Sequence, residues 1–197
     1  ECDPATGNIK EIDLERAALG SQQSEVIPNS IGNFPALEKL DLADNEWTGM
    51  STNIQHLDSL ITLDLHLNSI SQPAETIFSA LSQIGPDGAA TTSLRNVNLN
   101  NNRIHGDLPA FGARLAPLET LDLGHNDLSG ALPDDTFSHL TSMKEFSLSQ
   151  NRDLTGNVHE DFAMMASLEK LNIEDTGFTG EIFEFTNMGL LQELHAS

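Results

Sequence analysis

The stretch that decides the fold is Leu118–Asn126, which reads Leu-Glu-Thr-Leu-Asp-Leu-Gly-His-Asn and follows the pattern L-x-x-L-x-L-x-x-N. Clear copies of this pattern start at positions 37, 60, 94, 118 and 143, and weaker copies start at 9, 168 and 191. From position 37 onward the steps between starts are 23, 34, 24, 25, 25 and 23 residues. Such regularity across almost the whole chain predicts a solenoid in which each repeat forms one coil.

The alternating part of the pattern, L-x-L, predicts one short strand in each coil. Its apolar residues face the interior and the residues that alternate with them face outward. Stacked coils would join these strands into a parallel sheet with neighbouring strands ~4.8 Å apart. The Asn that closes the pattern is expected to turn inward and satisfy backbone groups at the bend, which makes it structural. This predicted ladder consists of Asn45, Asn68, Asn102, Asn126 and Asn151.

A second phrase, built around a glycine, follows the Asn in most copies. Examples are Ile104–Pro109 and Leu128–Pro133, while Ile27–Phe34 contains the Pro-x-x-Ile-Gly part. The glycine permits a tight turn and close packing between coils, and the proline ends a short extended piece. This phrase resembles the plant-type leucine-rich repeat, L-x-G-x-I-P-x-x-I-G-x-L. The resemblance covers nearly everything outside residues 71–93. It implies an α/β solenoid, a right-handed leucine-rich-repeat superhelix of about seven to eight repeats with a parallel β-sheet on its concave face.

The first residues also resemble this family. Cys2–Ile9 looks like the end of its N-terminal cap, so residues 1–8 are expected to be a remnant of that cap. In the family this cysteine pairs with an earlier one, which implies that Cys2, the only cysteine of the chain, is disulfide-bonded to a cysteine outside it. We therefore expect residues 1–197 to be a single leucine-rich repeat domain and a fragment of a longer chain.

The 34-residue step contains an insertion at residues 71–93. Within it Pro73–Ile84 has the pattern of an amphipathic helix, begun by Pro73 and stopped by Gly85. We expect this helix to lie on the outer wall, with docking of a partner as the alternative, and residues 86–93 to form a loop. A smaller insertion at Gly20–Glu25 follows the first strand.

Composition narrows the classes of partner. Thirty acidic residues against nine basic ones give a formal charge of −21, which repels nucleic acid and anionic lipid. The sequence contains no run of eighteen apolar residues, so no direct membrane insertion is predicted for this segment. Aromatic residues make up only 5% of the chain, so aliphatic packing is expected to dominate the core. Trp47 occupies a leucine position and is predicted to be buried.

The outward strand positions predict a binding face. Asp41 and Asp64 occupy the same outward position in neighbouring strands and would lie about 5 Å apart. They would either share a cation such as calcium or raise one another's pKa. A solvated, structural role for these aspartates is the alternative. His66 and His125 stand two coils apart, roughly 10 Å, which is too far to bind one metal ion, so no metal ligand is assigned.

An Asn-rich centre at Asn96, Asn98, Asn100 and Asn101 suits hydrogen bonding to a peptide or glycan. The middle column runs through Asp13, Asp41, Asp64, Asn98, Asp122, Ser147 and Asn172. The candidate ligand-binding residues are Asp41, Asp64, His66, Asn96, Asn98, Asn100, Asp122, His125, Ser147 and Asn172.

No catalytic motif such as G-x-S-x-G, G-x-x-x-x-G-K or H-E-x-x-H occurs, so the predicted function is non-catalytic. The leading hypothesis is a module that binds a protein, peptide or glycan on its concave face, without a cofactor. The family resemblance implies a receptor-like or secreted protein, extracellular or at the cell surface. The alternative is a structural or adhesive matrix or assembly protein whose acidic surface binds cations.

Overall fold

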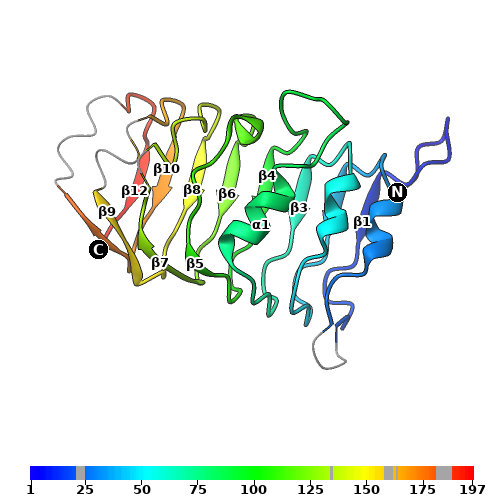
Figure 1. Cartoon of the computed structure of the whole chain (residues 1–197), viewed down its shortest axis with the longest axis horizontal. Helices are drawn as coiled ribbons and strands as arrows, with labels where there is room; N and C mark the ends of the chain where they lie inside the picture. The colour runs from blue at the N-terminus through cyan, green and yellow to red at the C-terminus, as the bar shows by residue number, and fades with distance from the viewer. Residues whose placement is uncertain (21–24, 134, 158–161, 163, 181–187) are drawn as a thin grey trace.

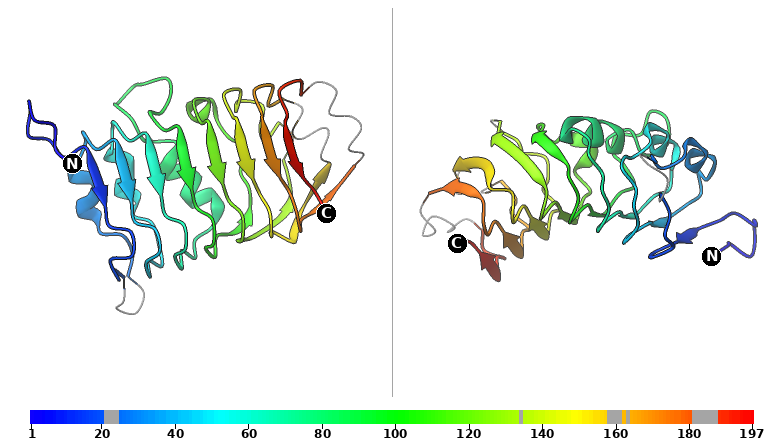
Figure 2. Two further views of the ribbon diagram at one scale, coloured as in Figure 1. Left: turned by 180° about the vertical axis from the view of Figure 1, so that it is seen from behind. Right: turned by 90° about the horizontal axis from the view of Figure 1, so that it is seen from below.

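The computed structural model describes residues 1–20, 25–133, 135–157, 162, 164–180 and 188–197, which form a curved stack of coils (Figure 1). In this described part, eight short strands form one parallel sheet in the order β1-β2-β3-β4-β6-β8-β10-β12. Figure 2 shows these strands side by side along the length of the molecule. The predicted solenoid with a parallel sheet on its concave face is thereby confirmed. The strands are β1 (Glu11–Asp13), β2 (Lys39–Asp41), β3 (Thr62–Asp64), β4 (Asn96–Asn98), β6 (Thr120–Asp122), β8 (Glu145–Ser147), β10 (Lys170–Asn172) and β12 (Glu193–His195).

The pairing register follows the repeat alignment residue by residue. Leu40 pairs with Leu63, and Leu171 pairs with Leu194 in the last described strand. From β2 to β10 the central residue of each strand is buried, while the first and third residues are partly or fully exposed on the concave side. The predicted middle column is therefore the row of third strand residues, and His195 extends it.

A second parallel sheet runs along the outer wall in the order β11-β9-β7-β5. The sequence predicted only a turn and a short extended piece in each coil here. Pairing of these pieces into a sheet depends on how neighbouring coils stack, which a single copy of the phrase does not reveal. Gly106 and Gly130 have φ +81° and +78°, which agrees with the predicted turn. An added Cβ would collide with the Asp107 carboxylate of the adjacent strand at Gly130 but would meet nothing within 4 Å at Gly106, so the predicted close packing between coils is found at Gly130 and not at Gly106. Residues 181–187, within the last copy of the phrase, lie outside the described residues. The strands are β5 (His105–Asp107), β7 (Asp127–Ala131), β9 (Asp153–Asn157) and β11 (Gly177–Thr179).

The described helices lie on the outer side of the coils (Figure 1). Helix α1 (Ala74–Leu81) falls inside the predicted helix and packs its apolar side against the solenoid, next to β5. Arg114 holds the loop after α1 by donating to the carbonyls of Ser82 (2.5 Å) and Ile84 (3.2 Å). Of the smaller predicted insertion at Gly20–Glu25, residues 21–24 lie outside the described residues. The 3₁₀ helices are η1 (Asn29–Asn33), η2 (Thr52–His56) and η3 (Ala113–Leu115).

The core is mostly aliphatic, as predicted, but it also contains a line of phenylalanines that composition did not reveal. One phenylalanine from each of five successive coils takes part, with successive ring centroids 4.7, 5.8, 5.0 and 5.4 Å apart. Phe111, Phe137 and Phe162 lie six or seven residues before the next copy of the pattern, while Phe78 of α1 and Phe178 of β11 extend the line at its two ends. Trp47 is 6% exposed, which confirms its predicted burial. The line consists of Phe78, Phe111, Phe137, Phe162 and Phe178.

The predicted Asn ladder is confirmed. Asn126 donates to the carbonyls of Leu123 (3.0 Å), Gly124 (3.2 Å) and, in the preceding coil, Leu99 (3.0 Å). Its Oδ1 accepts from the backbone N–H of Ile104 at 2.9 Å, so one side chain joins two coils. Equivalent bonds are made by Asn45, Asn68, Asn102 and Asn151.

Cys2 is exposed and unpaired, and its disulfide to a cysteine outside this chain stays a prediction. Among the described residues no helix combines the length and apolar character that a membrane span requires.

Candidate functional site

The row of third strand residues, called the concave row below, is built by one repeated local bond. At six of its positions the side-chain Oδ1 accepts from the backbone N–H two residues later. Asp64 accepts from His66 at 3.0 Å and Asp122 accepts from Gly124 at 2.8 Å. This turn bond selects Asp or Asn at the end of each strand. The concave row consists of Asp13, Asp41, Asp64, Asn98, Asp122, Ser147, Asn172 and His195.

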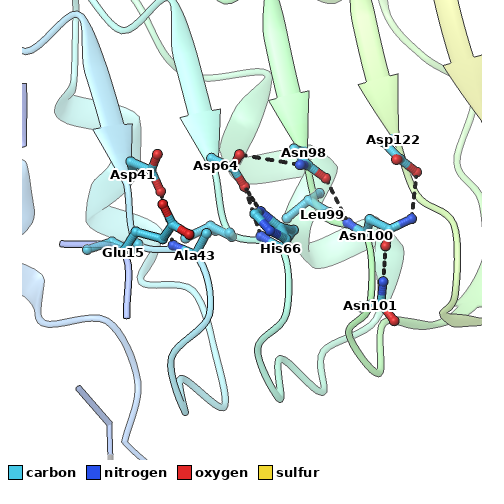
Figure 3. A network of polar contacts seen from close by, with 12 residues as sticks. Glu15, Asp41, Ala43, Asp64, His66, Asn98, Leu99, Asn100, Asn101 and Asp122 are labelled. Atoms are coloured by element: carbon cyan, nitrogen blue, oxygen red, sulfur yellow. Dashed lines mark hydrogen bonds and ion pairs between the residues drawn. The ribbon is translucent and has the colours of Figure 1, made fainter. Parts of the chain in front are cut away.

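In the middle of the sheet three side chains of the concave row and two side chains from the turns that follow the strands form what we call the central network (Figure 3). Asp64 contacts the His66 ring at 2.7 Å and accepts from Asn98 at 3.3 Å. Asn100 donates to Asp122 at 3.1 Å, and its own Oδ1 accepts from Asn101. These groups have few hydrogen-bonding positions left for a ligand. The central network consists of Asp64, His66, Asn98, Asn100 and Asp122.

The first strand residues beside this network are paired as well. Asn96 donates to Thr62 at 3.3 Å and accepts from the Thr120 hydroxyl at 3.0 Å. The Asn-rich centre that the sequence assigned to ligand binding therefore consists largely of amides that bind neighbouring coils. Its role in binding a ligand stays a prediction.

A pocket of about 380 Å³ opens on the concave face between β4 and β12. Its floor is the sheet itself, with Leu121, Phe146 and Leu171 among the lining residues. Its two sides are formed by the outward-facing residues of the strands, the first residues on one side and the third residues on the other. We call this the C-terminal pocket, and its polar lining includes Asp122, Glu145, Ser147, Lys170, Asn172 and His195.

Several polar atoms that line the C-terminal pocket have no partner among the described residues. Asp122 uses Oδ1 for its bonds to Gly124 and Asn100, which leaves Oδ2 unbonded. Asn172 uses only Oδ1, so both hydrogens of its amide are unpaired, and the His195 ring makes no side-chain bond. A hollow and unpaired donors and acceptors thus coincide at this place on the sheet.

The positive charge at the pocket is already compensated. Lys170 lies between Glu145 (3.3 Å) and Glu193 (3.9 Å), and its hydrogen bond to Glu145 raises the pKa of the Lys170 ammonium. One coil earlier, Lys144 lies 2.6 Å from Glu119 and lowers the pKa of that carboxyl. The pocket therefore keeps an excess of negative charge.

The aspartates at the N-terminal end of the row affect one another only in part as predicted. Burial is the main reason that the pKa of Asp41 is raised, and repulsion from Asp64 and Asp13 raises it further. Among the described residues, no group of three or more His, Cys, Asp or Glu side chains is arranged to hold a metal ion. His125 lies exposed at a turn with φ 52°, separate from the His66 ring, which binds Asp64.

Five polar residues of the pocket were not among the sequence candidates. Four of them could have been predicted from the alternation of side chains along each strand, because the first residue of a strand faces the same side of the sheet as the third. Apart from Asn96, the sequence analysis followed only the third and later positions. His195 belongs to the copy that starts at position 191, where Leu191 and Leu194 alone indicate the strand. The missed residues are Thr120, Glu145, Lys170, Glu193 and His195.

Residues 92–152 match the family model described as Leucine rich repeat, and the sheet has one parallel strand for every repeat. The chain belongs to the leucine-rich repeat family. Receptor-like protein 41 of Arabidopsis thaliana is 32% identical to it over 136 residues, which is 67% of this chain and 14% of that protein. The receptor-like protein Cf-9 homolog of Solanum lycopersicum is 30% identical over 183 residues, 78% of this chain and 20% of that protein.

A solved structure of the same leucine-rich repeat type extends the comparison. The plant peptide hormone receptor RGFR1 in complex with RGF2 superposes with a TM-score of 0.72 at 26% identity, over 88% of this chain and 26% of that one. The leucine-rich repeat chain therefore spans only about a seventh to a fifth of the length of the two relatives above.

Proposed function

We propose that this leucine-rich repeat chain is the extracellular recognition part of a receptor-like or secreted protein, and that it binds a peptide segment on its concave face. The observation that carries the proposal is the C-terminal pocket, where a hollow of about 380 Å³ coincides with unpaired polar groups. The relatives support it, since they are receptor-like proteins and RGFR1 was solved with RGF2.

The sheet beneath the pocket suits recognition because it is rigid. Parallel strands β6, β8, β10 and β12 present their side chains at intervals of ~4.8 Å, fixed by the backbone ladder. Preorganised side chains lose little conformational entropy when a ligand binds. A shallow trough across several strands fits an extended chain better than a compact molecule.

Binding rather than catalysis is the role that these side chains support. A nucleophile needs a base within hydrogen-bonding reach. The hydroxyl of Ser147 lies 3.3 Å from that of Ser149. Of the acids in the neighbouring positions, Asp122 accepts the turn bond from Gly124 and Glu145 forms an ion pair with Lys170. The proposed module is therefore non-catalytic.

The test is a selection of peptides by the chain, residues 1–197, from a phage-displayed library of random peptides. Selected peptides are synthesised and titrated against the wild-type chain and two variants. Asn172→Arg places a long cationic side chain across the pocket, while Thr76→Arg makes the same change on the exposed side of α1.

We expect the selected peptides to bind the wild type and Thr76→Arg equally, and Asn172→Arg at least about tenfold more weakly. Thermal unfolding of all three chains checks that the folds are equal. Peptides that bind Asn172→Arg as tightly as wild type, or no enrichment above an unrelated control protein, would overturn the proposal.

A further inference from the structure

We infer that the C-terminal pocket selects an extended peptide segment carrying an arginine or lysine, and that it holds this cation between Asp122 and Glu145. The inference rests on the proposed function and specifies the chemistry of the ligand. It is carried by the charge of the pocket, the placement of these two carboxylates and the absence of an anchoring residue from its described lining.

The charge of the pocket excludes an acidic ligand. Its lining contains the carboxylates of Asp122, Glu145 and Glu193 and a single ammonium group, Lys170, which leaves a net charge of −2 with His195 neutral. Lys170 is engaged by both glutamates, so it offers little attraction to an anion. The chain as a whole carries −21, which steers cationic partners toward it and repels anionic ones.

The two carboxylates stand on opposite sides of the trough. Asp122 is the third residue of β6 and Glu145 is the first residue of the adjacent β8, so strand spacing and rise place their Cα atoms roughly 8 Å apart. Asp122 is held in place through Oδ1, with Oδ2 unbonded, and Glu145 contacts Lys170 through Oε1 only. One acceptor oxygen on each side can therefore reach the same guanidinium or ammonium group.

The shape of the trough selects an extended backbone. The two outward rows are two residues apart along each strand, about 6.6 Å, and the trough crosses three strand spacings from β6 to β12, about 14 Å. That length corresponds to about four residues of extended chain. Beyond the cation site, the unpaired amide hydrogens of Asn172 and the ring of His195 can meet the carbonyls and N–H groups of such a backbone.

The described lining of the pocket offers no exposed aromatic anchor, because the Phe146 ring is only 2% exposed. Interfaces usually depend on a few Trp, Tyr or Arg residues in the centre of the contact. This chain has no tyrosine, its one tryptophan, Trp47, is buried, and no arginine is among the described residues that line the pocket. The central anchor must therefore come from the ligand, and a basic side chain is the one that the pocket complements.

The experiment compares matched peptides and matched variants. From the selected peptides, one is resynthesised with its arginine replaced by citrulline, which keeps the shape but removes the charge. Both are titrated against wild type, Asp122→Asn/Glu145→Gln and the control Asp127→Asn/Glu75→Gln, which removes equal charge from exposed positions on the outer side. Asp122→Asn preserves the turn bond, because Asn98 and Asn172 make the same bond in their own coils.

We expect arginine or lysine to be enriched among the selected peptides. The citrulline peptide should bind wild type and the control about tenfold more weakly than its arginine parent. That difference should disappear on Asp122→Asn/Glu145→Gln, as a double-mutant cycle requires.

The outcomes separate the two proposals. Selected peptides that lose binding on Asn172→Arg but lack a basic residue, or that bind Asp122→Asn/Glu145→Gln as tightly as wild type, overturn the cation site and leave the proposed function standing. Peptides whose binding is unaffected by Asn172→Arg overturn both.

Discussion

The central network and the C-terminal pocket lie on the same sheet, in the same row, and share Asp122, yet their polar atoms are used differently. In the central network Asp64 and Asn98 bind each other across coils, so the surface satisfies itself. In the pocket the Ser147 hydroxyl contacts Ser149 of its own coil and makes no bond to Asn172, whose amide hydrogens stay unpaired among the described residues. The comparison teaches that the repeat fixes the positions of the side chains, while the lengths of the side chains in neighbouring coils decide which polar atoms remain available to a ligand.

The interior of the coils shows the same contrast. The Asn ladder runs through the central coils and ends at Asn151, and the next coil has Thr176 at the equivalent position. Thr176 donates one bond, at 2.7 Å, to the carbonyl of Ile173. The sheet beneath the pocket is therefore held less firmly at its C-terminal edge than at its centre.

The largest expected effect comes from the Asn ladder. Asn126→Ala removes four buried hydrogen bonds and leaves the Ile104 N–H without a partner, which should lower the free energy of unfolding by about 3 kcal/mol. Thr176→Ala, with one bond lost, should cost about 1 kcal/mol. Urea unfolding measures both. Equal losses would mean that the additional bonds of Asn126 contribute nothing to stability.

The members of the central network that lie outside the pocket, represented by Asp64, should contribute to stability and not to binding. Asp64→Ala leaves the His66 N–H and the Asn98 amide without their acceptor and should lower the free energy of unfolding by about 2 kcal/mol. Ser147→Ala, in the same row, should change it by less than about 0.5 kcal/mol. Chemical denaturation and peptide titration of both variants check this. A loss of peptide affinity in Asp64→Ala at a temperature where it is fully folded would place the ligand on the central network.

Adding charge to the pocket should strengthen binding without altering the fold. Asn172→Asp keeps the turn bond, which Asp makes at positions 13, 41, 64 and 122. Affinity for arginine-containing peptides should rise about threefold, corresponding to about 0.6 kcal/mol. The gain should shrink in 0.5 M salt, where charges are screened more strongly. Isothermal titration at two salt concentrations measures it, and an unchanged or weakened affinity would argue against a cationic ligand.

The smallest expected effect concerns Asp41, whose pKa is raised mainly by burial. A carboxyl with a higher pKa in the folded state binds more protons when folded, so its ionisation opposes folding at neutral pH, and this cost disappears as the pH falls below the folded pKa. Asp41→Asn should therefore stabilise the chain at pH 7, by at most about 1 kcal/mol, and the gain should vanish at low pH. Thermal unfolding across pH tests this. A gain that grows as the pH falls would contradict the sign.

The sequence predicts most of the fold because the repeat fixes the register. Leu118–Asn126 and its copies place every residue of the concave row from Asp13 to Asn172 correctly, and Pro73–Ile84 encloses helix α1. The outer sheet escaped prediction, since Gly106 and Gly130 indicate turns in isolation and pair only when neighbouring coils stack. The line of phenylalanines escaped for the same reason.

The candidate site is less accessible to sequence analysis. The pattern identifies which residues face outward, but not that Asn100 reaches Asp122 or that Asn96 lies between Thr62 and Thr120. Those pairings depend on side-chain rotamers and on the offset between coils. The sequence therefore favoured the Asn-rich centre, where the amides are most numerous, whereas the structure shows that the unpaired groups lie farther along the sheet.

Hydrogen exchange of the chain with and without a saturating selected peptide, followed by mass spectrometry, tests most directly where the ligand lies. Slower exchange in residues 143–150 and 168–175, around β8 and β10, with no change in residues 60–68, around β3, is the expected result. Slower exchange confined to β3 and β4 would contradict the pocket as the binding site and return the ligand to the central network.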